Sequence, residues 1–96
     1  MPFLRYTSPD KGVQFVPLDR DVTTVGRSRE CEVMLEDLNV SRRHFQVRRS
    51  GNAYVLEDLK SKNGTHVNGA PVQHWNLSDG DLISAGDTKL LFKLEK

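Results

Sequence analysis

Short runs of β-forming residues alternate with polar turn sequences along this chain. Within several runs, apolar and polar side chains alternate with a period of two, which is typical of a strand that has one buried and one exposed face. Phe45 and Val47, for example, alternate with Gln46 and Arg48. The pattern predicts strands at Phe3–Thr7, Val13–Pro17, Val22–Val25, Phe45–Arg48 and Ala53–Leu59, and a last strand through Leu90, Phe92 and Leu94.

Turn sequences separate these runs at intervals of about 8–12 residues. Ser8–Gly12, Ser50–Asn52 and Ser78–Asp81 are turns by composition. Asn68-Gly69 is the strongest hairpin signal, because both central positions of a type I′ turn require a positive φ. Strands and turns at this spacing predict an all-β sandwich.

The stretch between Gly26 and Gly51 contains neither glycine nor proline and fits this pattern less well. Leu35, Leu38 and Phe45 are spaced as they would be on one face of a helix. A long helix is rejected because Asn39–Ser41 interrupts the stripe and no fourth apolar residue completes it. A single helical turn in this stretch remains open.

The composition predicts one globular domain that spans residues 1–96, with a core at about 3–94. The chain is 36% hydrophobic and 28% charged, and no apolar run is long enough to span a membrane. Its single cysteine, Cys31, excludes an intrachain disulfide, and the N-terminus lacks the features of a signal peptide, so we expect a cytoplasmic protein. We expect Cys31 to be a small buried residue whose thiol pKa is raised by its glutamate neighbours.

A formal net charge of +1 argues against bulk binding of nucleic acid. The seven aromatic residues also lie mostly at alternating, core-like positions rather than interleaved with bases. The charge is unevenly distributed, because residues 38–56 hold four arginines and no acid, whereas residues 76–88 hold three aspartates and no base. A local positive surface on a neutral body is therefore expected.

Three polar clusters follow strand-like runs, and Gly26-Arg27-Ser28 is the first of them. Glycine permits a sharp turn or the close approach of a ligand. A guanidinium at a strand end can bind a phosphate through two parallel hydrogen bonds. Taken alone, Arg27 could equally be a surface arginine after a turn.

The second cluster, Ser41-Arg42-Arg43-His44, places a hydroxyl beside a cation. Ser41 could instead cap a helical turn over residues 42–45. Ser41 and His44 could also be read as a nucleophile and its base, but the sequence has no Gly-x-Ser-x-Gly elbow and no carboxylate obviously placed behind His44. We expect His44 to support the loops from within the fold. His66 and His74 lie outside zinc-site spacings, so no metal is expected.

The third cluster runs from Ser61 to Gly69. The Asn63 amide has both a donor and an acceptor, and it can therefore pair with the backbone of an extended peptide. Its alternative role is to stabilise its own turn before Gly64. Asn68 and Gly69 are assigned to the hairpin. The clusters favour a site that binds an oxyanion and a peptide backbone, with no cofactor.

Taken together and in this order, these segments resemble the forkhead-associated (FHA) domain. The resemblance extends over about residues 3–94 and rests on four blocks: Gly26–Ser28, Ser41–His44, Asp58–Gly69, and Leu77 with Asp79–Ile83 and Gly86. It implies an FHA/SMAD-like sandwich of two mostly antiparallel sheets with about eleven short strands. It also implies that loops at one end bind phosphothreonine peptides, as a recruitment module in Ser/Thr-kinase signalling.

The resemblance also implies residue roles. Arg27 and Ser41 match phosphate-contacting positions, Arg42 matches a further polar or basic contact, and Asn63 matches the residue that binds the peptide main chain. Lys62 departs from the hydroxyl residue found in several members, so its contact with phosphate is left open. The loop-supporting positions are Gly26, His44, Ser61, Gly64, Thr65, Asn68 and Gly69.

The expected partner is a phosphothreonine-containing protein, rather than nucleic acid or a membrane, and the domain could belong to a larger protein. A hydrolase is disfavoured for want of a nucleophile, base and orienting group. The alternative that remains is a protein-interaction module that uses another face of the sandwich without phosphate.

Overall fold

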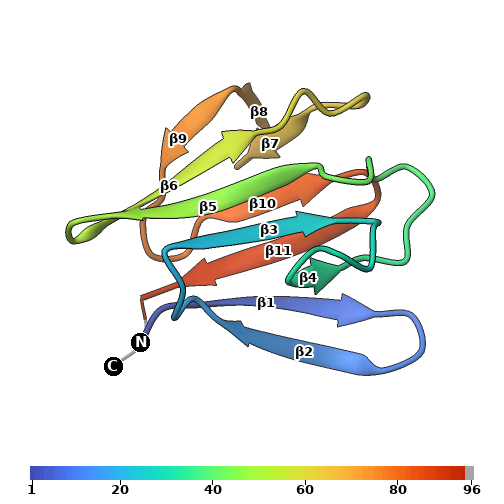
Figure 1. The fold of residues 1–96 in the computed structure, drawn as a ribbon, viewed down its shortest axis with the longest axis horizontal. Helices are drawn as coiled ribbons and strands as arrows, with labels where there is room; N and C mark the ends of the chain where they lie inside the picture. Colours follow the sequence, from blue (N-terminus) through green and yellow to red (C-terminus); the bar gives the residue numbers. More distant parts are fainter. Residues whose placement is uncertain (95–96) are drawn as a thin grey trace.

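The computed structural model describes residues 1–94, which form eleven strands and no helix (Figure 1). The strands are β1 (Phe3–Ser8), β2 (Gly12–Pro17), β3 (Val22–Gly26), β4 (Val33–Met34), β5 (Phe45–Ser50), β6 (Ala53–Asp58), β7 (Thr65–Val67), β8 (Ala70–Val72), β9 (His74–Asn76), β10 (Leu82–Ala85) and β11 (Thr88–Lys93). The strands expected from alternation are present, with ends that differ by a residue or two.

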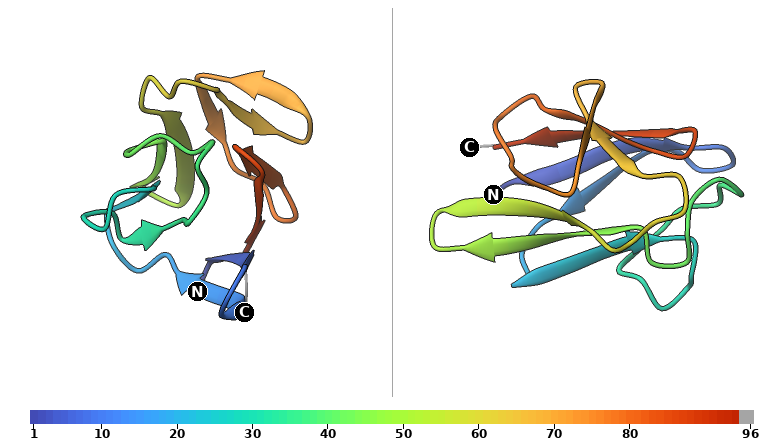
Figure 2. Two further views of the ribbon diagram at one scale, coloured as in Figure 1. Left: turned by 90° about the vertical axis from the view of Figure 1, so that its right-hand side faces the viewer. Right: turned by 90° about the horizontal axis from the view of Figure 1, so that it is seen from above.

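The strands form two sheets that lie face to face, as the end-on view in Figure 2 shows. The six-stranded sheet has the order β2-β1-β11-β10-β7-β8, and the five-stranded sheet has the order β4-β3-β5-β6-β9. The β3–β4 pair is parallel, whereas the other pairs are antiparallel. The expected all-β sandwich of two mostly antiparallel sheets is therefore confirmed.

The core fills the space between the sheets because alternate residues of each strand point inward. Phe45 and Phe92 are its largest members, and both are fully buried. The alternation predicted for the last strand fails at Leu94, which is 47% exposed. The strand ends at Lys93, whose partner Phe3 is the last position in the pairing with β1, so residue 94 has no neighbour in the sheet.

The Asn68-Gly69 turn joins β7 to β8 with φ values of 52° and 87°, as the predicted type I′ hairpin requires. The helical turn left open between Gly26 and Gly51 does not form. Leu35 and Phe45 are buried there, but Leu38 is 91% exposed, so the three leucine and phenylalanine positions do not share a face.

The expectation that the aromatic residues are mostly in the core is only partly right. Phe45 and Phe92 are buried, and Tyr6 and Tyr54 pack against the core. Phe15 and Trp75 are 62% and 42% exposed. Phe15 lies on the edge strand β2, where no further strand covers it.

The loops that carry the polar clusters gather at one end of the sandwich, on the right in Figure 1, and the N-terminus lies at the other end. The β3–β4 and β4–β5 connections of the five-stranded sheet meet there with the β6–β7 connection, which joins the two sheets. The β10–β11 turn of the six-stranded sheet lies at the same end (Figure 1).

Gly26 sets the distance between two of these loops. A Cβ atom at this position would lie 2.1 Å from the Arg42 carbonyl oxygen, which is backbone and cannot rotate away. We expect Gly26→Ala to lower the free energy of unfolding by about 3 kcal/mol, the upper end of the usual range for overpacking, because the two backbones must separate. Urea denaturation measures this loss.

The matched control is Gly51→Ala in the β5–β6 turn, where an added Cβ would meet nothing within 4 Å. Its φ of +60° gives a strain of only about 1 kcal/mol. Equal losses in the two variants would contradict this account of Gly26.

Candidate functional site

Backbone hydrogen bonds place Arg27 beside Ser41. The Arg27 N–H donates to the Ser41 carbonyl at 2.9 Å, and the Ser28 N–H donates to the Arg42 carbonyl at 3.1 Å. These bonds lie beyond the last register pair of β3 and β5, Val25 with Phe45. The two sequence clusters are thereby joined into one site.

The Arg27 side chain is held by one hydrogen bond, and its remaining donors are available to a ligand. Its Nε–H donates to the Val40 carbonyl at 3.0 Å. Within residues 1–94, its terminal Nη groups have no recorded partner, and the residue is exposed. The guanidinium is therefore oriented by the protein and can still donate two hydrogen bonds to an oxyanion.

The Ser41 hydroxyl links the second cluster to the third. Its oxygen accepts a hydrogen bond from the Lys62 backbone N–H at 2.9 Å, which leaves the hydroxyl proton free to be donated. The helix-capping alternative is wrong, because residues 42–45 form no helix. A nucleophile–base pair is also absent, since His44 Nδ1 accepts from the Ser41 backbone N–H rather than from its hydroxyl.

His44 is fully buried between the two loops. Nδ1 accepts the Ser41 N–H at 3.0 Å, and Nε2 lies 2.8 Å from the Gly64 carbonyl. This pair of bonds requires a neutral ring with its proton on Nε2, because Nδ1 must accept and Nε2 must donate. The imidazole therefore bridges the β4–β5 and β6–β7 connections.

Asn63 is held by a different loop from its own. Its Nδ2 donates to the Asn39 carbonyl at 2.8 Å, and no hydrogen bond from the backbone of residues 64–65 to its Oδ1 is present, so it does not form the turn considered before Gly64. The side chain is exposed, and among the described residues Oδ1 has no recorded partner. One donor and one acceptor of the amide thus remain for a ligand.

The β10–β11 turn anchors the loop that presents Asn39. Asp37 Oδ2 accepts from the Asp87 N–H at 2.8 Å and from Thr88 Oγ1 at 2.7 Å, while Oδ1 accepts from the Asn39 N–H at 2.9 Å. Asn39 Nδ2 donates to Asp87 Oδ2 at 2.9 Å. An added Cβ on Gly86 would meet the Asn39 backbone at 2.9 Å, which shows how closely the two segments pack.

Asp58 performs the same task for the β6–β7 connection. Its carboxylate accepts from Ser61 Oγ at 2.6 Å, from the Ser61 N–H at 3.2 Å and from Thr65 Oγ1 at 2.7 Å. Burial raises the pKa of Asp58, but the hydrogen bonds from Ser61 and Thr65 outweigh it and hold the pKa below its usual value.

Sequence reasoning missed Asp37, Asn39 and Asp58 as residues of the site. Their only signal was local: an aspartate two or three residues before an Asn or a Ser, the spacing at which its side chain can accept the following N–H.

Not every position expected to support the loops lies at this site. Gly64, with a φ of 82°, and Thr65 lie at its edge. Asn68 and Gly69 lie at the far end of β7, where Asn68 Nδ2 donates to Asp81 at 3.0 Å and Oδ1 accepts from the Leu82 N–H at 3.0 Å. They stabilise the hairpin rather than the loops.

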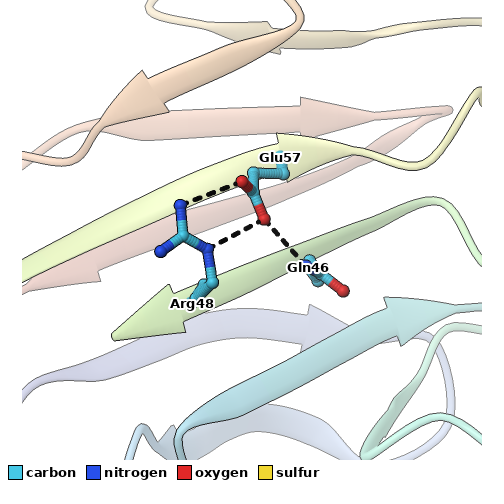
Figure 3. Close-up of polar contacts among 3 residues, drawn as sticks. All are labelled: Gln46, Arg48 and Glu57. Carbon is cyan, nitrogen blue, oxygen red and sulfur yellow. Dashed lines mark hydrogen bonds and ion pairs between the residues drawn. The ribbon is translucent and has the colours of Figure 1, made fainter. Parts of the chain in front are cut away.

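The positive surface predicted from residues 38–56 is narrower than expected. Arg42, Arg43 and Lys62 are exposed beside Arg27 and Ser41. Arg48 instead forms an ion pair with Glu57 at 3.0 Å on the outer face of the five-stranded sheet (Figure 3). Of the arginines in residues 38–56, Arg42 and Arg43 therefore lie at the loop end, whereas Arg48 is paired elsewhere.

Cys31 lies just behind this surface. It is 9% exposed, and its Sγ–H donates to the Arg42 carbonyl at 3.2 Å. Burial is the main cause that raises its thiol pKa, Arg43 opposes it, and Glu32 and Glu30 raise it further.

Among the described residues, no group of His, Cys, Asp or Glu side chains could hold a metal ion, and no helix could cross a membrane.

We expect His44→Ala to lower the free energy of unfolding by roughly 1–3 kcal/mol, because it leaves the Ser41 N–H and the Gly64 carbonyl without a partner. Thermal and urea unfolding measure this change. An unchanged stability would show that the buried imidazole does not support the loops.

The lowered pKa of Asp58 predicts a pH dependence of stability. A carboxyl group whose pKa is lower in the folded state stabilises the fold above its unfolded pKa, about 3.9, and this contribution is lost as pH falls through the folded value. The stability difference between wild type and Asp58→Asn should therefore be largest above about pH 4 and shrink at lower pH. Urea denaturation from pH 2.5 to 6 measures it, and a constant difference would contradict the assignment.

Comparisons with known proteins identify the family of this chain. The sequence model of the FHA domain matches residues 23–86. The FHA domain-containing protein FhaA of Mycobacterium tuberculosis is 44% identical over 70 residues, which cover 73% of this chain and 13% of FhaA. An oxoglutarate dehydrogenase inhibitor of Corynebacterium jeikeium is 42% identical over 84 residues, which cover 88% of this chain and 58% of the inhibitor.

Solved structures are also similar. The crystal structure of the FhaA FHA domain complexed with the intracellular domain of Rv3910 matches with a TM-score of 0.88 and 36% identity, over 97% of this chain and 100% of that chain. A structure from a study of phosphothreonine-dependent FHA domain interactions matches with a TM-score of 0.86 and 34% identity, over 99% of this chain and 97% of that chain. This chain belongs to the FHA domain family.

Proposed function

We propose that this domain binds phosphothreonine-containing segments of partner proteins through the loop end of the sandwich. One observation carries the proposal: Arg27 and Ser41 lie side by side, and the Arg27 Nη groups and the Ser41 hydroxyl proton have no partner among the described residues. A phosphate brings close to two negative charges and three acceptor oxygens, which match a guanidinium fork and a hydroxyl.

The remaining residues have complementary roles. Arg42 provides a further cation beside the phosphate, and the Asn63 amide pairs with the peptide main chain. The Lys62 backbone N–H is occupied by Ser41, so only the Lys62 ammonium can contribute to phosphate binding, as a point charge. Arg43 is exposed beside Arg42 and adds to the positive field.

The strength of such a site suits reversible recruitment. Each hydrogen bond to a charged group contributes roughly 1.5–3 kcal/mol. Three or four such bonds, less the costs of association and ordering, give an affinity in the micromolar range, about −8 kcal/mol. The site contains no nucleophile–base pair, because the Ser41 hydroxyl and His44 are not bonded to each other. We therefore assign binding and no catalysis to this site. We propose that the domain acts in a cytoplasmic signalling pathway.

The similar structures support this proposal. One belongs to a study of phosphothreonine-dependent interactions, and another is Mycobacterium tuberculosis EmbR in complex with a phosphopeptide, with a TM-score of 0.85 and 31% identity. The curated relatives are longer than this chain, so we propose that the domain acts within a larger protein.

We expect Arg27→Ala and Ser41→Ala each to weaken binding of a phosphothreonine peptide at least tenfold, because each removes a donor to the phosphate. Titration calorimetry measures the affinity, and thermal unfolding verifies that each variant is folded. Arg49→Ala is the matched control, since Arg49 is an exposed arginine in β5, outside the loop cluster. An Arg27→Ala variant that binds like wild type would contradict the site.

We expect phosphothreonine to bind more than tenfold better than phosphoserine in otherwise identical peptides. The family resemblance implies a pocket for the threonine methyl, whose burial provides about 0.8 kcal/mol, and a β-branched side chain loses fewer χ1 states on binding. Aspartate and glutamate should fail, because a planar carboxylate cannot reach Arg27, Ser41 and Arg42 together.

Fluorescence anisotropy at fixed ionic strength distinguishes these peptides. Equal binding of the phosphothreonine and phosphoserine peptides would contradict the expected pocket for the threonine methyl. Equal binding of the unmodified peptide would favour the alternative, an interaction that needs no phosphate.

A further inference from the structure

The outer face of the six-stranded sheet carries a row of side chains that the fold does not use. Register pairs align Phe15, Arg5, Leu91 and Leu82 across β2, β1, β11 and β10. Directly paired residues of antiparallel strands point to the same face. The neighbouring residue Leu4 is buried in the core, so this row points outward.

Much of this row is apolar and exposed. Phe15 is 62% exposed and Leu82 is 37% exposed, while Leu91 is half-buried. Phe3 packs edge-on against Phe15, with ring centroids 5.6 Å apart, and Val13 beside them is 55% exposed. Since the sandwich has only two layers, no other element of residues 1–94 covers this face (Figure 2).

Unpaired positive charge lies within the apolar row. Arg5 is at its centre, and Lys89 and Lys93 occupy outward positions of β11, on the same face as Leu91. Within residues 1–94, no ion pair or side-chain hydrogen bond is recorded for Arg5 or Lys89. Lys93 lies 3.4 Å from Asp79, at the edge of the face.

The outer face of the five-stranded sheet is different. There, Arg48 donates to Glu57 at 3.0 and 3.3 Å, and Gln46 donates to the same carboxylate at 2.8 Å (Figure 3). Arg48 is therefore neutralised by Glu57 on the neighbouring strand of the same sheet. The two faces therefore differ in whether their charges are satisfied internally.

We propose that the outer face of the six-stranded sheet, formed by Phe3, Arg5, Phe15, Leu82 and Leu91, docks an acidic amphipathic segment of a partner protein. The apolar side chains of this partner segment would cover the phenylalanine and leucine side chains of the face. The carboxylates of the segment would pair with Arg5 and Lys89. Burial of the apolar row provides affinity, whereas the unpaired cations select acidic over basic partners. Arg27 and Ser41 follow strands of the other sheet, so this contact requires no phosphate.

The test uses the ¹⁵N-labelled domain and two synthetic amphipathic peptides. One combines leucine with glutamate, and the other has lysine in place of each glutamate. The glutamate peptide should shift the amide resonances of β1, β2, β10 and β11, and the lysine peptide should not. Shifts that are absent, equal for the two peptides, or confined to the five-stranded sheet would overturn the proposal.

Charge-reversal variants locate the contact. Arg5→Glu combined with Lys89→Glu should weaken binding of the glutamate peptide at least tenfold, and Phe15→Ser should do the same. Arg49→Glu reverses one charge on β5, in the other sheet, and should leave that binding unchanged. Arg5 and Lys89 are exposed, so thermal unfolding should confirm folded variants. Unchanged affinity after both reversals would contradict the docking surface, whatever the fate of phosphopeptide binding.

Discussion

The arrangement of the loop end depends on the buried His44 imidazole. It bonds the Ser41 N–H on one side and the Gly64 carbonyl on the other. Both bonded groups belong to irregular backbone, which cannot satisfy itself through a sheet ladder. A neutral imidazole is one of the few side chains that can accept at one end and donate at the other, so it can satisfy two loops at once without a buried charge.

Two aspartates at the edge of the loop cluster also hold these loops in place. Asp58 fixes the connection that carries Lys62 and Asn63, and Asp37 ties the 37–41 segment to the β10–β11 turn of the opposite sheet. Carboxylates that accept several hydrogen bonds stiffen loops without needing a large core, which a 96-residue chain cannot supply. Loops held in this way lose little conformational entropy when a ligand binds, and this preserves affinity in a small site.

Local patterns in the sequence predicted most of the fold. The alternation around Phe45 and Val47 and the Asn68-Gly69 turn depend on neighbouring residues, and the structure confirms both. The backbone bond between Arg27 and Ser41 joins two loops beyond the paired residues of β3 and β5, and no local pattern specifies it. For that reason the polar clusters could be recognised in the sequence, but their arrangement in space could not be predicted from it. The family resemblance, rather than spacing, linked them.

The errors of prediction have the same origin. Leu94 was placed by alternation on the apolar face of the last strand, yet it is exposed because the strand ends before it. The single helical turn left open around Leu38 does not form, and Leu38 is exposed in a loop. Asp37 and Asp58 were overlooked because their partners Thr88 and Thr65 matter only once the loops fold back on them. Phe15 shows the converse: its alternation is that of a strand, but it lies on the outward face of β2, which no other element of residues 1–94 covers.

The central claim is that Arg27 and Ser41 form a phosphate site that the free domain already holds in place. The most direct test is a crystal structure of the domain with a bound phosphothreonine peptide. Phosphate oxygens should lie within hydrogen-bond distance of the Arg27 guanidinium and the Ser41 hydroxyl, and the backbone of both loops should move by less than about 1 Å. A phosphate bound elsewhere, or loops that must rearrange to reach it, would contradict the account.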